Sequence, residues 1–176
     1  MNVRNPEKEY ATVTRREGIS SANLIKALTA RGLDVEAVKK VCSEVAYCKT
    51  STGGTGYGIG YPTIGGGFVI WNPRIGRLNF VGPAGLSFVP DEFDCDTLHI
   101  FDQLADYLLY ISKIKNRPHE DVLIINSVFF ISHATAFLVR NRYAKVICSL
   151  KDTNVGKEEF NKIQATVPHA TVAMVI

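Results

Sequence analysis

Two aspartates that follow a short apolar stretch are the residues of this chain best placed for chemistry. Leu98–Phe101 predicts a strand, Asp102 follows it directly, and Asp106 lies one helical turn later, on the same face of the helix expected there. Carboxylates at the carboxyl end of such a strand could bind a divalent metal ion through their oxygens. In the structural alternative, Asp102 caps the helix and Asp106 is a solvated first-turn acid; spacing alone favours this alternative.

Length and composition describe an ordinary globular chain. Its 176 residues suit one domain, or one domain with a small subdomain, and 46% hydrophobic residues can bury a core. The net charge of +3 permits contact with nucleic acid but does not argue for it. No apolar run reaches the roughly 20 residues of a membrane span, and the N-terminus lacks the apolar core of a signal peptide. With cysteines that show no C-x-x-C spacing, these features predict a cytoplasmic protein with reduced thiols and no membrane partner.

The first half of the chain predicts a small α+β subdomain over residues 19–92, preceded by a flexible lead-in over residues 1–18. Ser20 or Ser21 is suited to cap a first helix, and Asp34 is suited to cap a second. The two helices would form a helical hairpin ahead of the strand-like part of the subdomain.

After this hairpin the hydrophobic period changes, and short runs separated by Gly, Pro and Asn predict a small, largely antiparallel sheet. The glycine-rich stretch 51–60 lacks the Lys-Ser/Thr ending of a phosphate loop, so a hairpin connection is the better interpretation. The acidic turn Pro90–Asp94 is a suitable subdomain boundary. The expected strands are Val45–Lys49, Tyr57–Tyr61, Gly67–Trp71 and Leu78–Val81.

The second half alternates strands with helices and predicts an α/β domain over residues 93–176. Its strand segments are continuous apolar runs, which is typical of strands covered on both faces. We therefore expect a mostly parallel four-stranded sheet flanked by helices, with right-handed crossovers. The strand segments are 98–101, 122–126, 145–150 and 171–176, and the helices fall near 103–114, 131–140 and 156–165.

Several short motifs, in this order, are similar to those of one protein family. They are Leu28–Asp34, Gly58–Pro62, Phe68–Pro73, Gly82–Ser87, Ile100–Tyr110 and Val122–Val128. Through them, residues 22–176 resemble the toprim domain, in the form found in primase-like proteins of mobile genetic elements, especially Bacteroides-type ones. The resemblance implies a glutamate, within a Glu-Gly-x-x-Asp motif, at the end of the first strand and an Asp-x-Asp motif at the end of the third. In that family these acids bind divalent metal for phosphoryl chemistry.

This chain departs from the family pattern at the positions that bind metal. Asp102 stands where the glutamate belongs, Gln103 replaces the glycine, and the motif's aspartate is kept as Asp106. At the end of the third strand, Lys151 and Thr153 fall on the two aspartate positions. Two carboxylates are thereby lost, and two-metal catalysis needs several acidic oxygens that bridge both ions.

Lys151 bears directly on metal binding, because an ammonium group repels a divalent cation. At about 4 Å and an effective dielectric of about 20, the repulsion is roughly several kcal/mol. Lys151 could instead pair with Asp102 and fill the space of the metal. Asp152 lies between the two altered positions and points away from the site, unless a one-residue slip of the turn brings it in. The turn glycine is kept as Gly156.

The expected result is a degenerate site with no confident catalytic residue, in a chain that is not an enzyme. Asp102, Asp106 and Asp152 are the weak candidates for metal ligands, and magnesium or manganese would be the cofactor only if they form a working site. Otherwise we expect no cofactor. His99 lies inside the first strand of the second half and is expected to be packed rather than to bind metal.

The first of three classes of function is a catalytically inactive primase-like core. It would bind single-stranded nucleic acid or a replication or mobilisation protein, with Lys49, Arg74 and Arg77 as candidate contacts. Tyr61 and Trp71 are candidate surfaces for base stacking. The competing interpretation is a solvated basic edge with core aromatics, which the usual burial tendencies favour.

Two further classes remain open. One is an active metal-dependent nucleotidyltransferase or nuclease with a rebuilt site on Asp102, Asp106 and Asp152. The other is a protein-interaction scaffold, an accessory or inhibitory factor with no nucleic-acid role, because a fold does not fix a function. The helix expected to begin near Thr153 could also accept a phosphate group without any metal.

Overall fold

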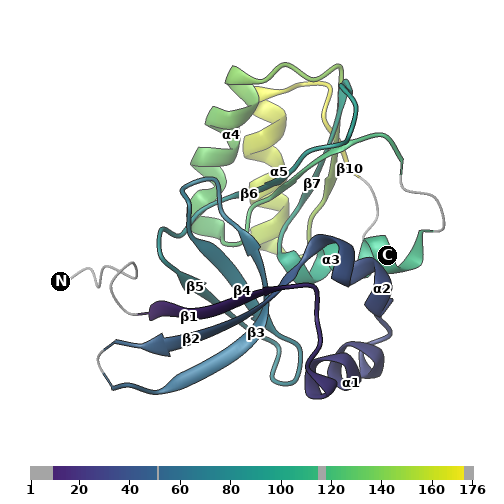
Figure 1. Cartoon of the computed structure of the whole chain (residues 1–176). Helices are drawn as coiled ribbons and strands as arrows, with labels where there is room; N and C mark the ends of the chain where they lie inside the picture. Colours follow the sequence, from purple (N-terminus) through teal and green to yellow (C-terminus); the bar gives the residue numbers. More distant parts are fainter. Residues whose placement is uncertain (1–9, 51, 115–117, 173–176) are drawn as a thin grey trace. The chain divides into compact units, whose positions relative to one another are not determined.

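The computed structural model describes residues 10–50, 52–114 and 118–172, which form two compact units (Figure 1). The first unit contains the chain up to Ala84 and the segment that begins at Leu108; the second contains Gly85–Tyr107 and the rest of the chain. Each unit has its own five-stranded sheet. The division precedes the expected boundary at residue 92, because strand β6 (Ser87–Val89) pairs with the second sheet.

The predicted helical hairpin is present in the first unit as the consecutive helices α1 and α2. Helix α1 (Ala22–Ala30) is capped by Ser21, whose hydroxyl oxygen accepts a hydrogen bond from the backbone N–H of Leu24 at 3.5 Å. Helix α2 (Val35–Val41) is capped by Asp34, whose carboxylate accepts from two backbone N–H groups. No helix within the described residues is long and apolar enough to cross a membrane.

The sheet of the first unit is an antiparallel meander in the order β1-β2-β3-β4-β5, as the sequence predicts for its last four strands. The expected flexible lead-in is wrong for residues 10–17, because strand β1 (Tyr10–Glu17) pairs along the whole of β2. The sequence analysis did not predict this strand, because charged residues stand beside its β-branched residues Thr12–Thr14. Residues 1–9 of the expected lead-in lie outside the described residues. The other strands are β2 (Ser43–Lys49), β3 (Thr55–Pro62), β4 (Phe68–Asn72) and β5 (Arg77–Val81).

Glycine at alternate positions of β3 lets its neighbours pack across the strand. A Cβ atom at Gly56 would lie 2.6 Å from Cζ of Tyr47, so the aromatic ring occupies the space of the missing side chain. A Cβ atom at Gly58 would lie 2.6 Å from the carbonyl oxygen of Trp71 on β4. The glycine-rich stretch is therefore a packing feature of a hairpin strand, in agreement with the rejected phosphate-loop interpretation.

The sheet of the second unit has the order β10-β9-β7-β8-β6. Its first four members run parallel, as predicted. Strand β6 adds an antiparallel edge strand, which the sequence did not predict because three residues show no clear pattern. The expected last strand is described only as far as residue 172. The parallel strands are β7 (Thr97–Phe101), β8 (Asp121–Ile124), β9 (Lys145–Ser149) and β10 (Thr171–Val172). The helical segments after β6 are α3 (Leu104–Lys113), which belongs to the first unit from Leu108 on, η2 (Val128–Phe130), α4 (Ile131–Arg140) and α5 (Asn154–Thr166).

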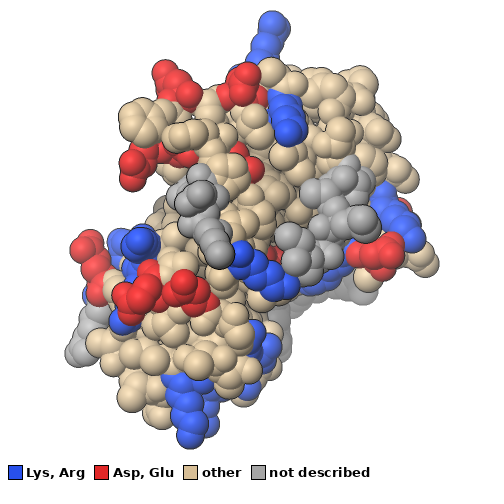
Figure 2. Space-filling model, turned by 90° about the vertical axis from the view of Figure 1, so that its right-hand side faces the viewer, with Lys and Arg blue, Asp and Glu red and all other residues tan. Residues whose placement is uncertain are grey.

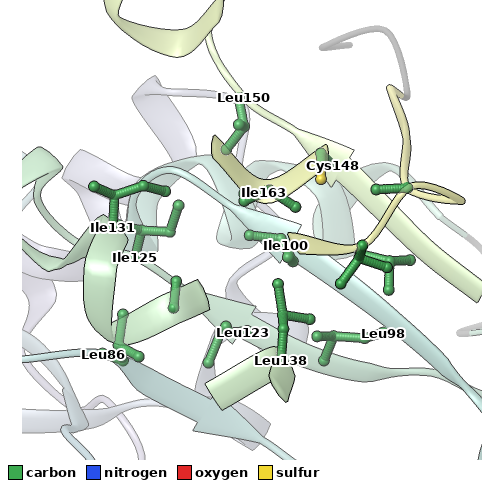
Figure 3. Close-up of a cluster of buried hydrophobic side chains, with 14 residues drawn as sticks. Leu86, Leu98, Ile100, Leu123, Ile125, Ile131, Leu138, Cys148, Leu150 and Ile163 are labelled. Atoms are coloured by element: carbon green, nitrogen blue, oxygen red, sulfur yellow. The ribbon is translucent and has the colours of Figure 1, made fainter. Parts of the chain in front are cut away.

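One aliphatic cluster forms the core of the second unit (Figure 3). Helices α4 and α5 lie side by side against one face of the sheet, and their apolar faces meet residues of β7, β8 and β9 (Figure 1). Burial of each large aliphatic side chain here contributes roughly 1.5–3 kcal/mol. The cluster includes Leu98, Ile100, Leu123, Ile125, Ile131, Leu138, Val146, Cys148, Leu150 and Ile163.

The packing of β3 gives a first prediction. Gly58→Ala should lower the free energy of unfolding by roughly 1–3 kcal/mol, because the added methyl group meets backbone that has to shift. Gly85→Ala is the matched control, because a Cβ atom there meets nothing within 4 Å, and it should be neutral or stabilise by up to about 1 kcal/mol. Urea unfolding of both variants is the measurement. Equal losses in the two variants would contradict the packing explanation.

Candidate functional site

The carboxyl ends of β7 and β9 meet at one edge of the second sheet, because the two strands are parallel neighbours. Asp102 follows β7, and Lys151 follows β9 after one intervening residue. Lys151 Nζ lies 3.3 Å from Oδ2 of Asp102 and 3.9 Å from Oδ2 of Asp106. The ion pair that the sequence offered as the alternative to a metal is thus present.

Asp106 is not the solvated first-turn acid of the structural alternative. Its side chain is 27% exposed, and that of Asp102 is 14% exposed. Burial raises the pKa of Asp106, the nearby Lys151 ammonium lowers it, and repulsion from Asp102 raises it further. Because 3.9 Å is too long for a hydrogen bond, Oδ2 of Asp106 has no hydrogen-bond partner among the described residues.

Sequence reasoning missed a third carboxylate at this edge, that of Glu159 on α5. Glu159 is 2% exposed, and its Oε1 atom has no hydrogen-bond partner in the described part of the chain. Burial is the main reason that its pKa rises to about 7; repulsion from Asp102 adds to the rise, and attraction to Lys151 and Lys162 opposes it. The sequence did hold a signal, because Gly156, Glu159 and Ile163 share the helical spacing of a buried face.

The turn between β9 and α5 keeps Asp152 away from the acidic pair. Asp152 is 86% exposed on its side chain and pairs with Lys157 at 2.9 Å, so the expected alternation holds without a slip of the turn. Thr153 caps α5, and its hydroxyl oxygen accepts a hydrogen bond from the backbone N–H of Gly156 at 3.1 Å. A Cβ atom at Gly156 would overlap the carbonyl oxygen of Lys151, which explains the glycine there.

A metal ion would find few ligands in this arrangement. Among residues 10–50, 52–114 and 118–172, no group of three or more His, Cys, Asp or Glu side chains is placed to hold one. Of the three weak candidates, Asp102 and Asp106 lie together around Lys151, and Asp152 has a different partner. Two carboxylates alone hold magnesium weakly, because the ion keeps most of its waters.

His99 is packed inside the sheet, as the sequence predicts. It is 4% exposed, and its Nδ1 lies 3.3 Å from Oε1 of the buried Glu120. Its Nε2 lies 2.8 Å from the hydroxyl oxygen of Ser149 on β9. These hydrogen-bonded contacts satisfy a polar ring on a central strand and tie β7 to β9 and to the residue that precedes β8.

The basic candidates of the first unit lie at two separate turns of its meander, the β2–β3 turn and the β4–β5 turn (Figure 1). Lys49 is the half-buried last residue of β2. Arg74 lies in the β4–β5 turn and Arg77 opens β5, and both are exposed.

The aromatic candidates are less open. Trp71 is 5% exposed, and the guanidinium of Arg31 lies 5.4 Å from its ring centroid. Trp71 is therefore a core residue with a covered face, as the competing interpretation expects, and it offers little surface for stacking on bases. Tyr61 is half-buried.

Comparisons with protein-family models and with curated proteins find no match. Among solved structures, the chain is similar to the primase fragment of the bacteriophage T7 primase-helicase protein. The TM-score is 0.63 and the identity 11%, over 94% of this chain and 70% of that one. The chain has a primase-like fold.

A second similar structure is that of bacteriophage T7 lagging-strand DNA polymerase interacting with primase domains of two gp4 subunits, bound to an RNA/DNA hybrid and dTTP. The TM-score is 0.57 and the identity 13%, over 93% of this chain and 85% of that one. At such identities the likeness is one of fold. It confirms the predicted primase-like architecture, and the mobile-element context stays a prediction.

Glu159 gives a prediction for pH dependence. Its pKa in the folded chain is about 7 against an ordinary value of 4.5, so the folded state holds a proton that the unfolded state releases in this window. Ionisation of Glu159 should therefore lower the free energy of unfolding by roughly 2–3 kcal/mol as pH rises from 4.5 to 7. Above pH 7 this group should cause no further loss. Glu159→Gln should remove this loss, so its advantage over the unsubstituted chain in urea unfolding should be larger at pH 8 than at pH 5.

The exposed neighbour Glu158 provides the control for this experiment. Glu158→Gln makes the same chemical change on the solvated side of α5. If both variants change the pH dependence alike, or if the advantage of Glu159→Gln is the same at both pH values, burial of Glu159 does not control the effect.

Proposed function

We propose that this chain is a primase-like core that has lost metal-dependent chemistry and works by binding nucleic acid. The observation that carries the proposal is the position of Lys151, whose ammonium lies beside the two carboxylates best placed to bind a metal. A positive charge on a flexible stem compensates Asp102 without any ion from solution. A divalent ion would have to displace it against direct repulsion.

The second altered position supports the same conclusion. The Thr153 hydroxyl oxygen accepts a hydrogen bond at the start of α5, so this position serves the helix instead of a metal. Phosphoryl transfer with two ions needs several carboxylate oxygens that bridge both of them. Asp102 and Asp106 alone provide too little negative charge for that, and Glu159 holds its proton up to about pH 7.

The binding role rests on the fold and on the basic residues of the β4–β5 turn in the first unit. One of the similar structures contains primase domains bound to an RNA/DNA hybrid, and this chain carries exposed Arg74 and Arg77. The proposed setting is a mobile element or phage in a reducing cytoplasm, which the free cysteines support. A replication or mobilisation protein is the competing partner for the same role.

The loss of metal chemistry can be tested by titration calorimetry with manganese chloride. The unsubstituted chain should show no binding below about 1 mM, because two carboxylates compete poorly with water. Lys151→Asp should bind with a dissociation constant of roughly 10⁻⁴ M, because it replaces the repelling charge with a carboxylate beside Asp102 and Asp106. Neither protein should extend a primer or cleave nucleic acid, since a single weak ion does not supply two-metal catalysis.

Lys157→Asp is the matched control, because it makes the same charge change at an exposed lysine that pairs with Asp152. It should gain no manganese affinity. Micromolar binding by the unsubstituted chain, or manganese-dependent synthesis or cleavage by it, would overturn the proposal in favour of an active nucleotidyltransferase or nuclease.

A further inference from the structure

The β4–β5 turn of the first unit and the end of α1 form one small basic surface. Arg31 follows α1, and its Nε donates a hydrogen bond to the carbonyl oxygen of Pro73 in the turn. One of its terminal nitrogens lies 3.3 Å from the position that a Cβ atom would take at Gly76. In Figure 1 the end of α1 lies beside this turn, in agreement with these contacts.

The turn itself has a fixed conformation. The Asn72 side-chain oxygen accepts from the backbone N–H of Arg74 at 3.0 Å, and the Asn72 backbone oxygen accepts from Gly76 at 2.9 Å. The Asn72 amide donates to the backbone oxygen of Tyr57 on β3 at 3.1 Å, which anchors the turn to the sheet. Gly76 has a φ of 68°, a conformation that favours glycine. The backbone that carries Arg74 and Arg77 is thus held in place before any ligand arrives.

The charges on this surface are not neutralised within the described structure. Arg31, Arg74 and Arg77 are exposed, and none of them forms an ion pair with a described carboxylate. Figure 2 shows Lys and Arg side chains on the surface at the height of α1 in Figure 1. Ile75, at the tip of the turn, is 69% exposed and adds an apolar contact among the arginines.

We infer that Arg31, Arg74 and Arg77 form a site for the phosphate backbone of single-stranded nucleic acid, with Ile75 against a base or sugar. Guanidinium groups bind phosphate oxygens through paired N–H donors, and Arg31 is already oriented for this by Trp71 and Pro73. Contacts of this kind position a strand without reading its sequence. This inference rests on the proposed binding role and adds to it the site, the ligand class and Arg31.

The test is fluorescence anisotropy of the full chain with a fluorescein-labelled 20-nucleotide oligo-dT. Arg74→Glu combined with Arg77→Glu should weaken binding at least tenfold at 0.1 M NaCl. The negative slope of log affinity against log salt should also become shallower by about 1.4, since each lost phosphate contact on a single strand is worth about 0.7. Oligo-dA should behave like oligo-dT, because the site contacts the backbone.

The matched control is Arg140→Glu combined with Arg142→Glu. Both residues are exposed in the second unit, and the change in net charge is the same. This control should keep its affinity within about threefold, which separates a local site from the effect of overall charge. Arg31→Gln provides a second, independent variant and should weaken binding without reversing a charge. Thermal unfolding checks that all variants are folded.

Each outcome has a distinct meaning. If both double variants lose affinity equally, the local site is wrong and net charge governs binding. If the Arg74 and Arg77 double variant binds like the unsubstituted chain, the site lies elsewhere while the binding role stands. If the unsubstituted chain binds no oligonucleotide even at 0.05 M NaCl, the inference and the binding part of the proposed function both fall. Equal competition by oligo-glutamate would reassign the surface to an acidic protein segment.

Discussion

The second unit depends on the burial of β7 between two parallel neighbours. Its hydrogen bonds go to β8 on one side and β9 on the other, and its apolar side chains enter the main core. A parallel pairing brings the carboxyl ends of strands to one edge, so the residues after β7 and β9 have to meet there. The proximity of Asp102 to Lys151 is therefore a consequence of topology, whatever chemistry those side chains support.

At that edge the chain itself places a cation beside the two carboxylates, the Lys151 ammonium. An ion drawn from solution binds according to its concentration, whereas the Lys151 ammonium is always present beside Asp102. The gain in stability from such a pair is small, because the partly exposed groups lose hydration and side-chain freedom on pairing. The pair also offsets part of the negative charge at this edge without an ion from solution.

Much of this arrangement could be predicted from the sequence, because its signals are local. Asp34 precedes a short helix and caps it where expected. Gly156, the one residue of the expected turn motif that the chain keeps, lies in the first turn of α5. Glu159 was missed because charged neighbours such as Glu158 and Lys162 make this part of the sequence resemble a solvated helix. Its burial depends on residues far away in the sequence. Arg31 was missed for a related reason, because its role arises from a turn that lies far away in the sequence.

Two strands, β1 and β6, could not be predicted from local sequence patterns. β1 carries charges that resemble a solvated tail, and it becomes a strand because β2 offers it a free edge. β6 has only three residues and no period of its own, and its pairing with β8 defines it. In both segments the decisive information is the partner strand, which composition and periodicity do not contain.

The glycines of β3 have a consequence for how this protein can vary. The ring of Tyr47 lies where a side chain at position 56 would be, and the hydroxyl oxygen of Tyr47 accepts a hydrogen bond from Asn79 at 2.8 Å. A larger residue at position 56 therefore requires the Tyr47 ring to move or a smaller residue at position 47, and either change would disturb the hydrogen bond from Asn79. Positions 47, 56 and 79 lie on three different strands, and substitutions at them should consequently occur together among relatives.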